Sequence, residues 1–308
     1  MAATGHAGAT RPHIFIQTNN KQSIGAIVSA YSMKRNSAHA DQFDVTVMQQ
    51  EDYPFFAKRE GQTYMRHGVK RVWHENDLQS FTLTRFLPPQ LMGYQGRALV
   101  VDPDVFAVQD VWELLSRDMK GKAIMCRGSK FKNGAFASSV MLLDCARLKH
   151  WDVEKSFNEL FEGKRDYHNW ISLLMEDRNS IGTFEDEWND FDKLTPATKM
   201  IHNTRRRTQP WKTGLKVDYT PTEFVPVIGW IMRMRRKLFG DHALLGRYAR
   251  HPDRNQEAFF FGLLKEAYEK GLVTDAQIKE AMSNNFIRHD SYDVMKSVPP
   301  LAPLKAAA

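Results

Sequence analysis

The sequence predicts an α/β protein whose mostly parallel central sheet is flanked by helices and followed by a helical C-terminal extension. The chain begins with an apolar strand, an amphipathic helix and a second strand, an order that favours parallel pairing. Further apolar strands alternate with helical patterns as far as residue 176. Beyond Pro226 every pattern is helical, which marks a change of architecture.

The β-α-β start is the clearest of these patterns. Residues 13–20 predict a strand that ends in polar side chains, and residues 43–48 predict its parallel neighbour. Between them, residues 23–35 predict a helix with an apolar stripe, and Ser23 is placed to act as its N-cap.

The first strand ends in Gln17, Thr18 and Asn19. Ligands of parallel sheets bind beyond the carboxyl ends of the strands, so these three residues form a candidate binding edge. No glycine-rich phosphate loop follows them, which argues against a nicotinamide-dependent enzyme or a P-loop ATPase.

The remaining elements follow from apolar runs and helical periodicity. A helix over 80–86 ends at Pro88. The other expected elements are strands over 97–101, 123–126 and 139–143, a helix that begins over 111–115, and helices over 153–162, 167–176, 227–238, 256–270 and 275–285. The chain is thereby divided into a flexible leader over 1–12, an α/β domain over 13–220, a helical extension over 221–297 and a loose tail over 298–308.

The composition is that of a globular protein. Of 308 residues, 42% are hydrophobic, and 19 Phe, 9 Tyr and 7 Trp supply enough apolar surface to exclude disorder as the main state. The two cysteines, Cys126 and Cys145, are too few for a disulfide scaffold. We expect free thiols in a reducing compartment, a bridge between them being the less favoured alternative.

The net charge of +7 is concentrated in one segment. Residues 203–240 contain nine basic and two acidic side chains, which account for the whole surplus. A nucleic-acid-binding protein usually spreads its basic residues over a broad face, so a local anionic partner is expected and nucleic acid is not. The leader lacks the apolar segment of a signal peptide, and the longest apolar run, 224–232, is too short to span a bilayer. These features predict a cytoplasmic protein.

Two carboxylates follow the apolar strand over 97–101. Asp102 and Asp104 flank Pro103, which fixes one backbone angle and favours a turn on which both side chains converge. Two adjacent carboxylates repel each other when they are desolvated, and a hard divalent cation such as Mg²⁺ or Mn²⁺ relieves that repulsion. Taken alone, the segment is more typical of a solvated polar turn.

Several segments, taken in order, resemble glycosyltransferase family 8, a family with the GT-A fold that includes glycogenin and bacterial lipopolysaccharide galactosyl- and glucosyltransferases. Asp102 and Asp104 resemble its D-x-D motif. The other matching segments are His13 to Asn20, Thr84-Arg85-Phe86, Phe136 to Leu143, Asp166, Trp188-Asn189, and Lys199 to His202 followed by Gln209-Pro210-Trp211. The resemblance covers residues 13–212, about two thirds of the chain. The chain departs from the family pattern at Ala137, Ser139, Tyr167 and Gln209, which leaves the donor sugar open.

The resemblance assigns roles to individual residues. It implies a metal site of Asp102, Asp104 and His202 that holds Mn²⁺ or Mg²⁺. It places Gln17, Thr18, Asn19, Arg85 and Asp102 at the nucleotide, and Ser138, Arg205, Arg207 and Lys212 at the donor sugar or its diphosphate. It also makes Asp166 the catalytic residue beside the anomeric carbon.

Three of these assignments have structural alternatives. His202 by itself is more typical of a partly buried histidine bonded to a backbone carbonyl, and only the D-x-D and Pro-Trp segments favour a metal ligand. Asp166 is equally suited to cap the helix that follows it. The arginines after His202 are equally suited to a solvated loop.

A basic amphipathic pattern occupies residues 227–238. Trp230, Ile231, Met234 and Leu238 share one helical stripe with Val227, and basic side chains up to Lys237 lie toward the other side. This pattern is typical of a helix on an anionic membrane surface, and it also fits a helix packed on its own core.

The resemblance implies a metal-dependent, retaining glycosyltransferase. It would move a hexose from a UDP-sugar to a saccharide or a lipid-linked glycan in polysaccharide or lipopolysaccharide synthesis, as a cytoplasmic or peripheral membrane protein. The alternatives are a degenerate member that binds nucleotide sugar or membrane without turnover, and a nucleotidyltransferase. The absence of a glycine-rich, lysine-bearing loop after the first strand counts against the last.

Overall fold

The computed structural model describes residues 10–128, 134–219, 231, 234, 238 and 246–302. These residues form two compact units, which are treated separately below. The first unit runs to Glu75 and resumes from Gln79 to His202, and the second runs from Asn203 to Ala302 with Asn76–Leu78. The predicted leader and tail, 1–12 and 298–308, lie largely outside the described residues, and the predicted domain boundary at residue 220 stays a prediction.

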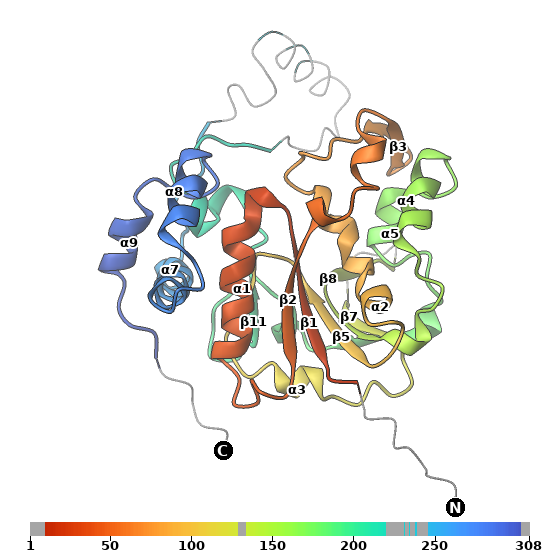
Figure 1. Ribbon diagram of the computed structural model, residues 1–308, viewed down its shortest axis with the longest axis horizontal. Coiled ribbons are helices and arrows are strands. Elements are labelled where there is room, and N and C mark those ends of the chain that lie inside the picture. The colour runs from red at the N-terminus through yellow and green to blue at the C-terminus, as the bar shows by residue number, and fades with distance from the viewer. Residues whose placement is uncertain are drawn as a thin grey trace, which may run out of the picture. The chain divides into compact units, whose positions relative to one another are not determined.

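A six-stranded sheet forms the centre of the first unit, in the order β2-β1-β5-β8-β7-β9 (Figure 1). Strand β8 is antiparallel to both of its neighbours, and the other adjacent pairs are parallel. The prediction of an α/β fold with a mostly parallel sheet flanked by helices is therefore confirmed. The strands are β1 His13–Thr18, β2 Asp44–Gln49, β5 Arg97–Val101, β7 Ile124–Gly128, β8 Phe136–Asp144 and β9 Ile181–Phe184.

The inner strands β1 and β5 are apolar because both of their faces are covered. Ile14, Ile16, Val100 and Val101 are fully buried, as parallel strands inside a layered sheet require. The register pairs Ile16 with Val101, so the residues that follow each strand leave the sheet side by side. This pairing positions the polar ends of β1 and β5 at one edge.

Helix α1, Ser23–Arg35, follows β1 over the residues that the periodicity predicts and packs against β1 and β2 (Figure 1). The prediction that Ser23 caps this helix is wrong. Gln22 is the N-cap residue and makes no side-chain cap, because Ser23 is already helical and its hydroxyl donates instead to the carbonyls of Asn19 and Asn20, each at 3.2 Å.

The helix predicted over 167–176 is shorter than expected. Helix α5 covers Tyr167–Ile171 and is followed by Leu173 with a left-handed φ of 57°, which stops helical propagation. The segment over 80–86 is a 3₁₀ helix, Ser80–Phe86. The other helices of this unit are α2 Pro88–Leu91, α3 Trp112–Leu115 and α4 Val153–Phe161.

Two small sheets lie outside the central one, and the sequence patterns did not predict them. Strands β3, Thr63–Arg66, and β4, Val69–Val72, form a hairpin. Its two-residue turn, His67-Gly68, has positive φ angles of 54° and 69°, which is typical of a tight hairpin turn. A three-stranded sheet has the order β10-β11-β6, with β6 Val105–Ala107, β10 Asp190–Phe191 and β11 Met200–His202. These strands are too short for a periodic signal.

The second unit is built on three described helices. Helix α7 covers Arg254–Glu269, α8 covers Asp275–Ser283 and α9 covers Ser291–Ser297. Trp211 packs on Phe260 of α7 with ring centroids 4.7 Å apart. Of the helix predicted over 227–238, only residues 231, 234 and 238 are described, and these are helical; the rest lies outside the described residues.

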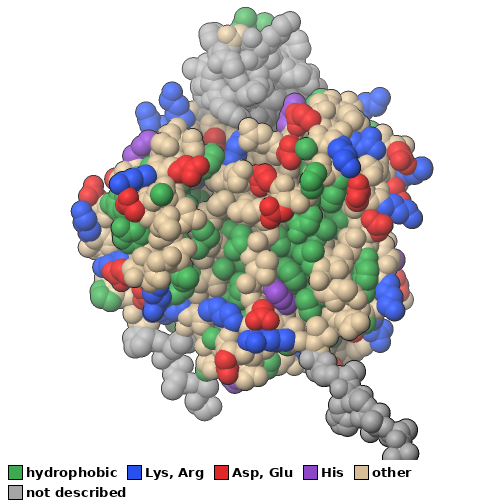
Figure 2. Space-filling model, viewed as in Figure 1, with side chains coloured by type: hydrophobic (Ala, Val, Ile, Leu, Met, Phe, Trp, Pro, Cys, Tyr) green, Lys and Arg blue, Asp and Glu red, His purple; other side chains and the backbone are tan. Residues whose placement is uncertain are grey.

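Burial and charge agree with the composition. Cys126 and Cys145 are both free and buried, as predicted, and burial raises the pKa of each thiol to about 12. Figure 2 shows acidic and basic side chains interspersed over the face in view, in keeping with a charge surplus confined to one segment of the sequence. Among the described residues, no helix is long and apolar enough to cross a bilayer.

Candidate functional site

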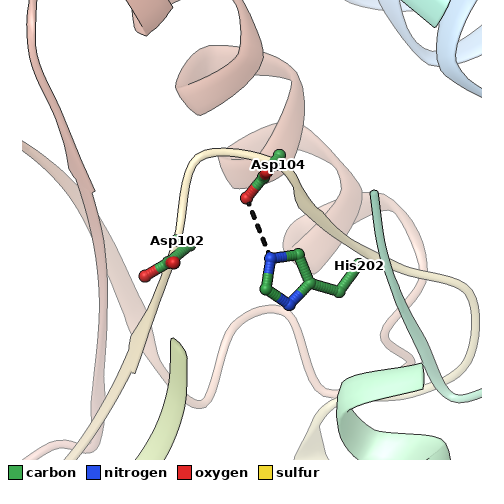
Figure 3. A group of neighbouring side chains, drawn as sticks. All are labelled: Asp102, Asp104 and His202. Atoms are coloured by element: carbon green, nitrogen blue, oxygen red, sulfur yellow. Dashed lines mark ion pairs between the residues drawn. The ribbon is translucent and has the colours of Figure 1, made fainter. Parts of the chain in front are cut away.

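Asp102, Asp104 and His202 form one group at the end of β5 (Figure 3). Asp102 directly follows β5, and Asp104 directly precedes β6. Strand β11 pairs antiparallel with β6 so that His202 lies opposite Val105. The pairing of two short strands therefore brings the histidine to the acidic turn, and the three predicted metal ligands meet.

The three side chains lie within reach of a single ion. One ligand atom from each lies within 4.8 Å of the other two. Opposite ligands of an ion with bonds of about 2.1 Å are separated by about 4.2 Å, so only a small contraction is needed. His202 Nε2 lies 3.2 Å from Asp104 Oδ1, the contact marked in Figure 3.

Asn189 orients the imidazole of His202. The side-chain oxygen of Asn189 accepts a hydrogen bond from His202 Nδ1 at 2.9 Å. The amide nitrogen of Asn189 donates to Ser139 Oγ at 3.0 Å. In the neutral imidazole, a proton fixed on Nδ1 leaves the lone pair of Nε2 directed at Asp104. Metal-binding histidines are commonly held in this way by a second residue.

Asp102 is held by a network of predicted nucleotide-site residues. Its carboxylate accepts from Gln17 Nε2 and from Arg85, whose NH2 group lies 3.0 Å from Oδ1 and 3.3 Å from Oδ2. Arg85 NH1 donates to Ser138 Oγ at 2.5 Å, and Ser138 donates to the carbonyl of Ile171. The structure thus brings together four residues that the sequence analysis selected separately.

The electrostatics of the group are those of a site short of positive charge. Burial raises the pKa of Asp102, and the guanidinium of Arg85 only partly opposes this effect. Burial alone would lower the pKa of His202, but the carboxylates of Asp104 and Asp102 outweigh it and raise that pKa. A buried Asp-Asp-His group of this kind supplies the mixed oxygen and nitrogen ligands that suit Mn²⁺ or Mg²⁺.

Gly25 of α1 is a site residue that the sequence analysis missed. A Cβ atom at this position would lie 2.9 Å from the backbone carbonyl oxygen of Pro103. The absence of a side chain therefore lets the turn between Asp102 and Asp104 approach the helix closely. A lone glycine within a helical pattern carries no signal for such a contact in a single sequence.

Thr18 and Asn19 are buried beside this network. Thr18 Oγ1 donates to the carbonyl of Asn19 at 3.1 Å, and Asn19 Nδ2 donates to Ser80 Oγ at 3.2 Å. Their contact with a nucleotide stays a prediction.

Asp166 lies in a different environment from the acidic pair. It caps α5, where Oδ1 accepts the backbone N–H groups of His168 at 2.8 Å and Asn169 at 3.2 Å. Its other oxygen accepts the N–H of Gly68, in the hairpin turn, at 3.0 Å. Burial would raise the pKa of Asp166, but these N–H groups outweigh it and lower it. The structure gives Asp166 the capping geometry, and its catalytic role stays a prediction.

Arg205, Arg207 and Lys212 belong to the second unit. Lys212 is almost fully buried, and its ammonium group donates to Asp218 Oδ2 at 2.7 Å and to the carbonyl of Asn285 at 3.3 Å. The contact of these three residues with a donor diphosphate stays a prediction.

Comparisons with known proteins give only distant similarities. No protein-family model matches the chain, and no curated protein matches it. Among solved structures, the glycosyltransferase GlyE of Streptococcus pneumoniae TIGR4 is 13% identical over 86% of this chain and 64% of its own, with a TM-score of 0.47. The galactosyltransferase LgtC, in complex with donor and acceptor sugar analogues, is 10% identical over 65% of this chain and 89% of its own, with a TM-score of 0.45.

Mouse xyloside xylosyltransferase 1 is 12% identical over 63% of this chain and 97% of its own, with a TM-score of 0.41. The chain spans less than two thirds of the length of GlyE. All three are transferases of sugars, the class that the sequence motifs resemble. Because these TM-scores are below 0.5, the functional argument rests on the site itself.

Proposed function

We propose that the protein is a metal-dependent glycosyltransferase of the GT-A type that moves a hexose from a UDP-sugar to a saccharide or lipid-linked glycan. The observation that carries this proposal is the group of partly buried Asp102 and Asp104 with buried His202 at the carboxyl end of a central strand. Ligands of α/β sheets bind at this edge, and the acidic turn lies beside Gln17 and Arg85.

Each residue of the group has a separate task. Asp102, Asp104 and His202 would hold the cation, which when bound supplies positive charge to a diphosphate leaving group. Gln17 and Arg85 fix the orientation of the Asp102 carboxylate, and Asn189 fixes that of the His202 ring. The side chains are therefore ordered before a ligand arrives, which lowers the entropy cost of binding.

The test is hydrolysis and transfer of UDP-hexoses, measured with Mn²⁺ and with a chelator. We expect turnover with Mn²⁺, loss of turnover with the chelator, and loss in Asp102→Asn by at least about 100-fold, as for other residues that stabilise developing charge. Asp118→Asn, which changes an exposed aspartate of the same unit, is the matched control and should keep full activity. Metal-dependent UDP binding without turnover would instead identify a non-catalytic nucleotide-binding protein. Release of hexose 1-phosphate, the product left when the uridylyl group is transferred, would identify a nucleotidyltransferase.

The resemblance to family 8 also favours retention of the anomeric configuration. Proton NMR of the first product formed from a UDP-α-hexose distinguishes the two outcomes, since retention gives the α-linked product. A β-linked first product would overturn this part of the proposal while leaving sugar transfer intact.

Peripheral attachment to an anionic membrane has one specific observation in its favour. Ile231, Met234 and Leu238 are helical and exposed, with exposed fractions of 45%, 45% and 68%. Their spacing places them on one face, and the sequence between Trp230 and Lys237 includes four basic residues. We expect co-sedimentation with vesicles that contain phosphatidylglycerol and weaker binding to pure phosphatidylcholine. Equal binding to both kinds of vesicle would contradict the proposal.

A further inference from the structure

An open cavity of about 520 Å³ lies between the β3–β4 hairpin and the start of α5. Figure 1 shows β3 close to α4 and α5. The volume of this cavity is in the range of small-molecule sites. Among the described residues that line it, the only apolar side chain is that of Met65, and the others are mostly basic or polar: His67, Lys164, Arg165, Asp166, His168 and Asn169, with Gly68 and Gly163.

Two stacked histidines form one wall of this cavity. The rings of His67 and His168 are 3.9 Å apart, centroid to centroid, and are inclined by 24°. His67 occupies the first position of the hairpin turn with a φ of 54°, where asparagine or glycine is the residue that such turns favour. Histidine, like asparagine, is one of the non-glycine residues that adopt this conformation more readily than most.

The charges around the cavity differ in how far they are already paired. Arg165 is bound to Glu159 through Nε at 3.1 Å and NH2 at 2.8 Å, so most of its charge is compensated. Lys164 pairs with Glu162 at 2.7 Å, but both side chains are largely exposed, and such pairs are weak. Lys164 can therefore turn toward a ligand at little cost.

The acidic member of the lining does not present an open carboxylate. Both oxygens of Asp166 accept hydrogen bonds from backbone N–H groups, those of His168, Asn169 and Gly68. Asp166 thereby ties the hairpin turn to α5 and holds the two histidines against each other. The cavity is also lined by the two imidazoles, the ammonium of Lys164 and the amide of Asn169, all of which can donate hydrogen bonds. His168 Nδ1 lies 3.4 Å from Ser172 Oγ.

We propose that this cavity binds the anionic group, a phosphate or a carboxylate, of a charged saccharide that serves as the acceptor. Helix α5 begins at the cavity and ends near the group of Asp102, Asp104 and His202. The carbonyl of Ile171, the last residue of the helix, accepts a hydrogen bond from Ser138, which in turn accepts one from Arg85. A five-residue helix is about 7.5 Å long, roughly the length of one or two sugar rings. The acceptor assignment rests on the proposed function, whereas anion binding in the cavity does not.

The test is ligand binding to the full chain, measured by titration with glucose 6-phosphate, glucuronate and glucose. We expect at least one of the two charged sugars to bind at least about tenfold more tightly than glucose, the difference expected of one charge-assisted contact. A preference between them identifies the anion as phosphate or carboxylate. Burial and the neighbouring His67 lower the pKa of His168, and an anion favours its protonated form, so the affinity should also rise as the pH falls below about 6.5. The charged groups that modulate this effect are Arg66, Lys164, Arg165 and Asp166.

The variants separate a binding role from a structural one. His67→Asn keeps a residue that tolerates the left-handed turn, and His168→Gln keeps a hydrogen-bond donor on α5. We expect the double variant to fold with an unchanged thermal midpoint and to lose at least about tenfold in affinity for the charged sugar. Lys70→Gln removes a charge from the same hairpin outside the cavity and should have no effect. Equal binding of glucose and the charged sugars, or full affinity in the double variant, would overturn the proposal.

Binding of UDP with Mn²⁺ is measured in the same samples. A protein that binds Mn²⁺-UDP but shows no preference for charged sugars contradicts this inference alone. A protein that binds a charged sugar but not Mn²⁺-UDP contradicts the proposed function alone and leaves the anion site standing.

Discussion

Asp104 and Asp166 are both aspartates of the first unit, and both follow from the same family resemblance, yet their surroundings are opposite. Asp104 faces a second carboxylate and a histidine at the end of a buried strand. Asp166 faces the backbone N–H groups of a helix start and a hairpin turn. The first site holds two neighbouring carboxylates that face one arginine and one titratable histidine. The second holds a single carboxylate whose oxygens already accept backbone N–H groups.

The number of N–H groups that a carboxylate already accepts, more than its residue type, separates a candidate metal ligand from a structural cap. A carboxylate that accepts three N–H groups gains stability from them and has little left for chemistry. Asp102, Asp104 and His202, whose ring is fixed by Asn189, each keep a ligand atom within 4.8 Å of the other two. Five predictions test this difference.

The largest expected effect is the pH dependence of Mn²⁺ affinity. A metal must displace the proton from His202, whose pKa is raised by Asp104 and Asp102, so the affinity should fall as the pH drops from 8 to 6. One displaced proton gives a change of up to about tenfold per pH unit. Isothermal titration at several pH values measures it, and His202→Gln should flatten the profile. A flat profile in the native chain would contradict the assignment of His202 as a ligand.

In the metal-free protein, the same raised pKa predicts the opposite trend for stability. Protonated His202 stabilises the fold fully below its unfolded pKa of about 6.5, and this contribution disappears as the pH rises through the higher folded value. Urea unfolding in a chelator should therefore show a decline in the contribution of His202 over that interval, measured as the difference between the native chain and His202→Gln.

Asn189→Ala should weaken Mn²⁺ binding by about 10- to 100-fold, the usual effect of losing a residue that orients a metal ligand. The fold should persist, because β10 and β11 remain paired. Titration with Mn²⁺ measures the loss. Asn179→Ala, which changes an asparagine at an exposed loop of the same unit, is the matched control. Unchanged affinity in Asn189→Ala would show that the imidazole does not depend on this hydrogen bond.

Gly25→Ala should lower Mn²⁺ affinity by about tenfold and the free energy of unfolding by about 1–3 kcal/mol. Alanine favours helices by about 1 kcal/mol over glycine, but its Cβ atom meets a backbone carbonyl that cannot rotate away. Denaturation and Mn²⁺ titration separate the two effects. An increase in stability without loss of Mn²⁺ affinity would contradict this prediction, because it would show that the turn between Asp102 and Asp104 moves away from the added Cβ atom at little cost.

Asp166→Ala should leave Mn²⁺ affinity unchanged and lower the free energy of unfolding by about 1–3 kcal/mol, because it leaves N–H groups of α5 and the hairpin turn without their acceptor. Asp166→Asn should recover part of that loss. Loss of Mn²⁺ binding in either variant would contradict the separation of the two aspartates.

The sequence predicted the parts of the site that lie at the ends of strong apolar strands. Gln17 and Asp102 follow β1 and β5, and their proximity follows from parallel pairing. The arrangement of His202 depends on the pairing of β6 with β11, two three-residue strands with no periodic signal of their own. The cap of α5 by Asp166 was one of the two roles that the sequence left open. Its further bond to Gly68 depends on a hairpin turn that a pattern search does not find, because the residues of β3 and β4 alternate poorly between apolar and polar.

UDP binding to the native chain and to Asp104→Asn, each with Mn²⁺ and with a chelator, tests directly whether Asp102, Asp104 and His202 form a metal site for a nucleotide. We expect Mn²⁺ to tighten UDP binding to the native chain by at least about tenfold, and we expect Asp104→Asn to abolish this gain in affinity. Tightening by Mn²⁺ that survives in Asp104→Asn would contradict this assignment.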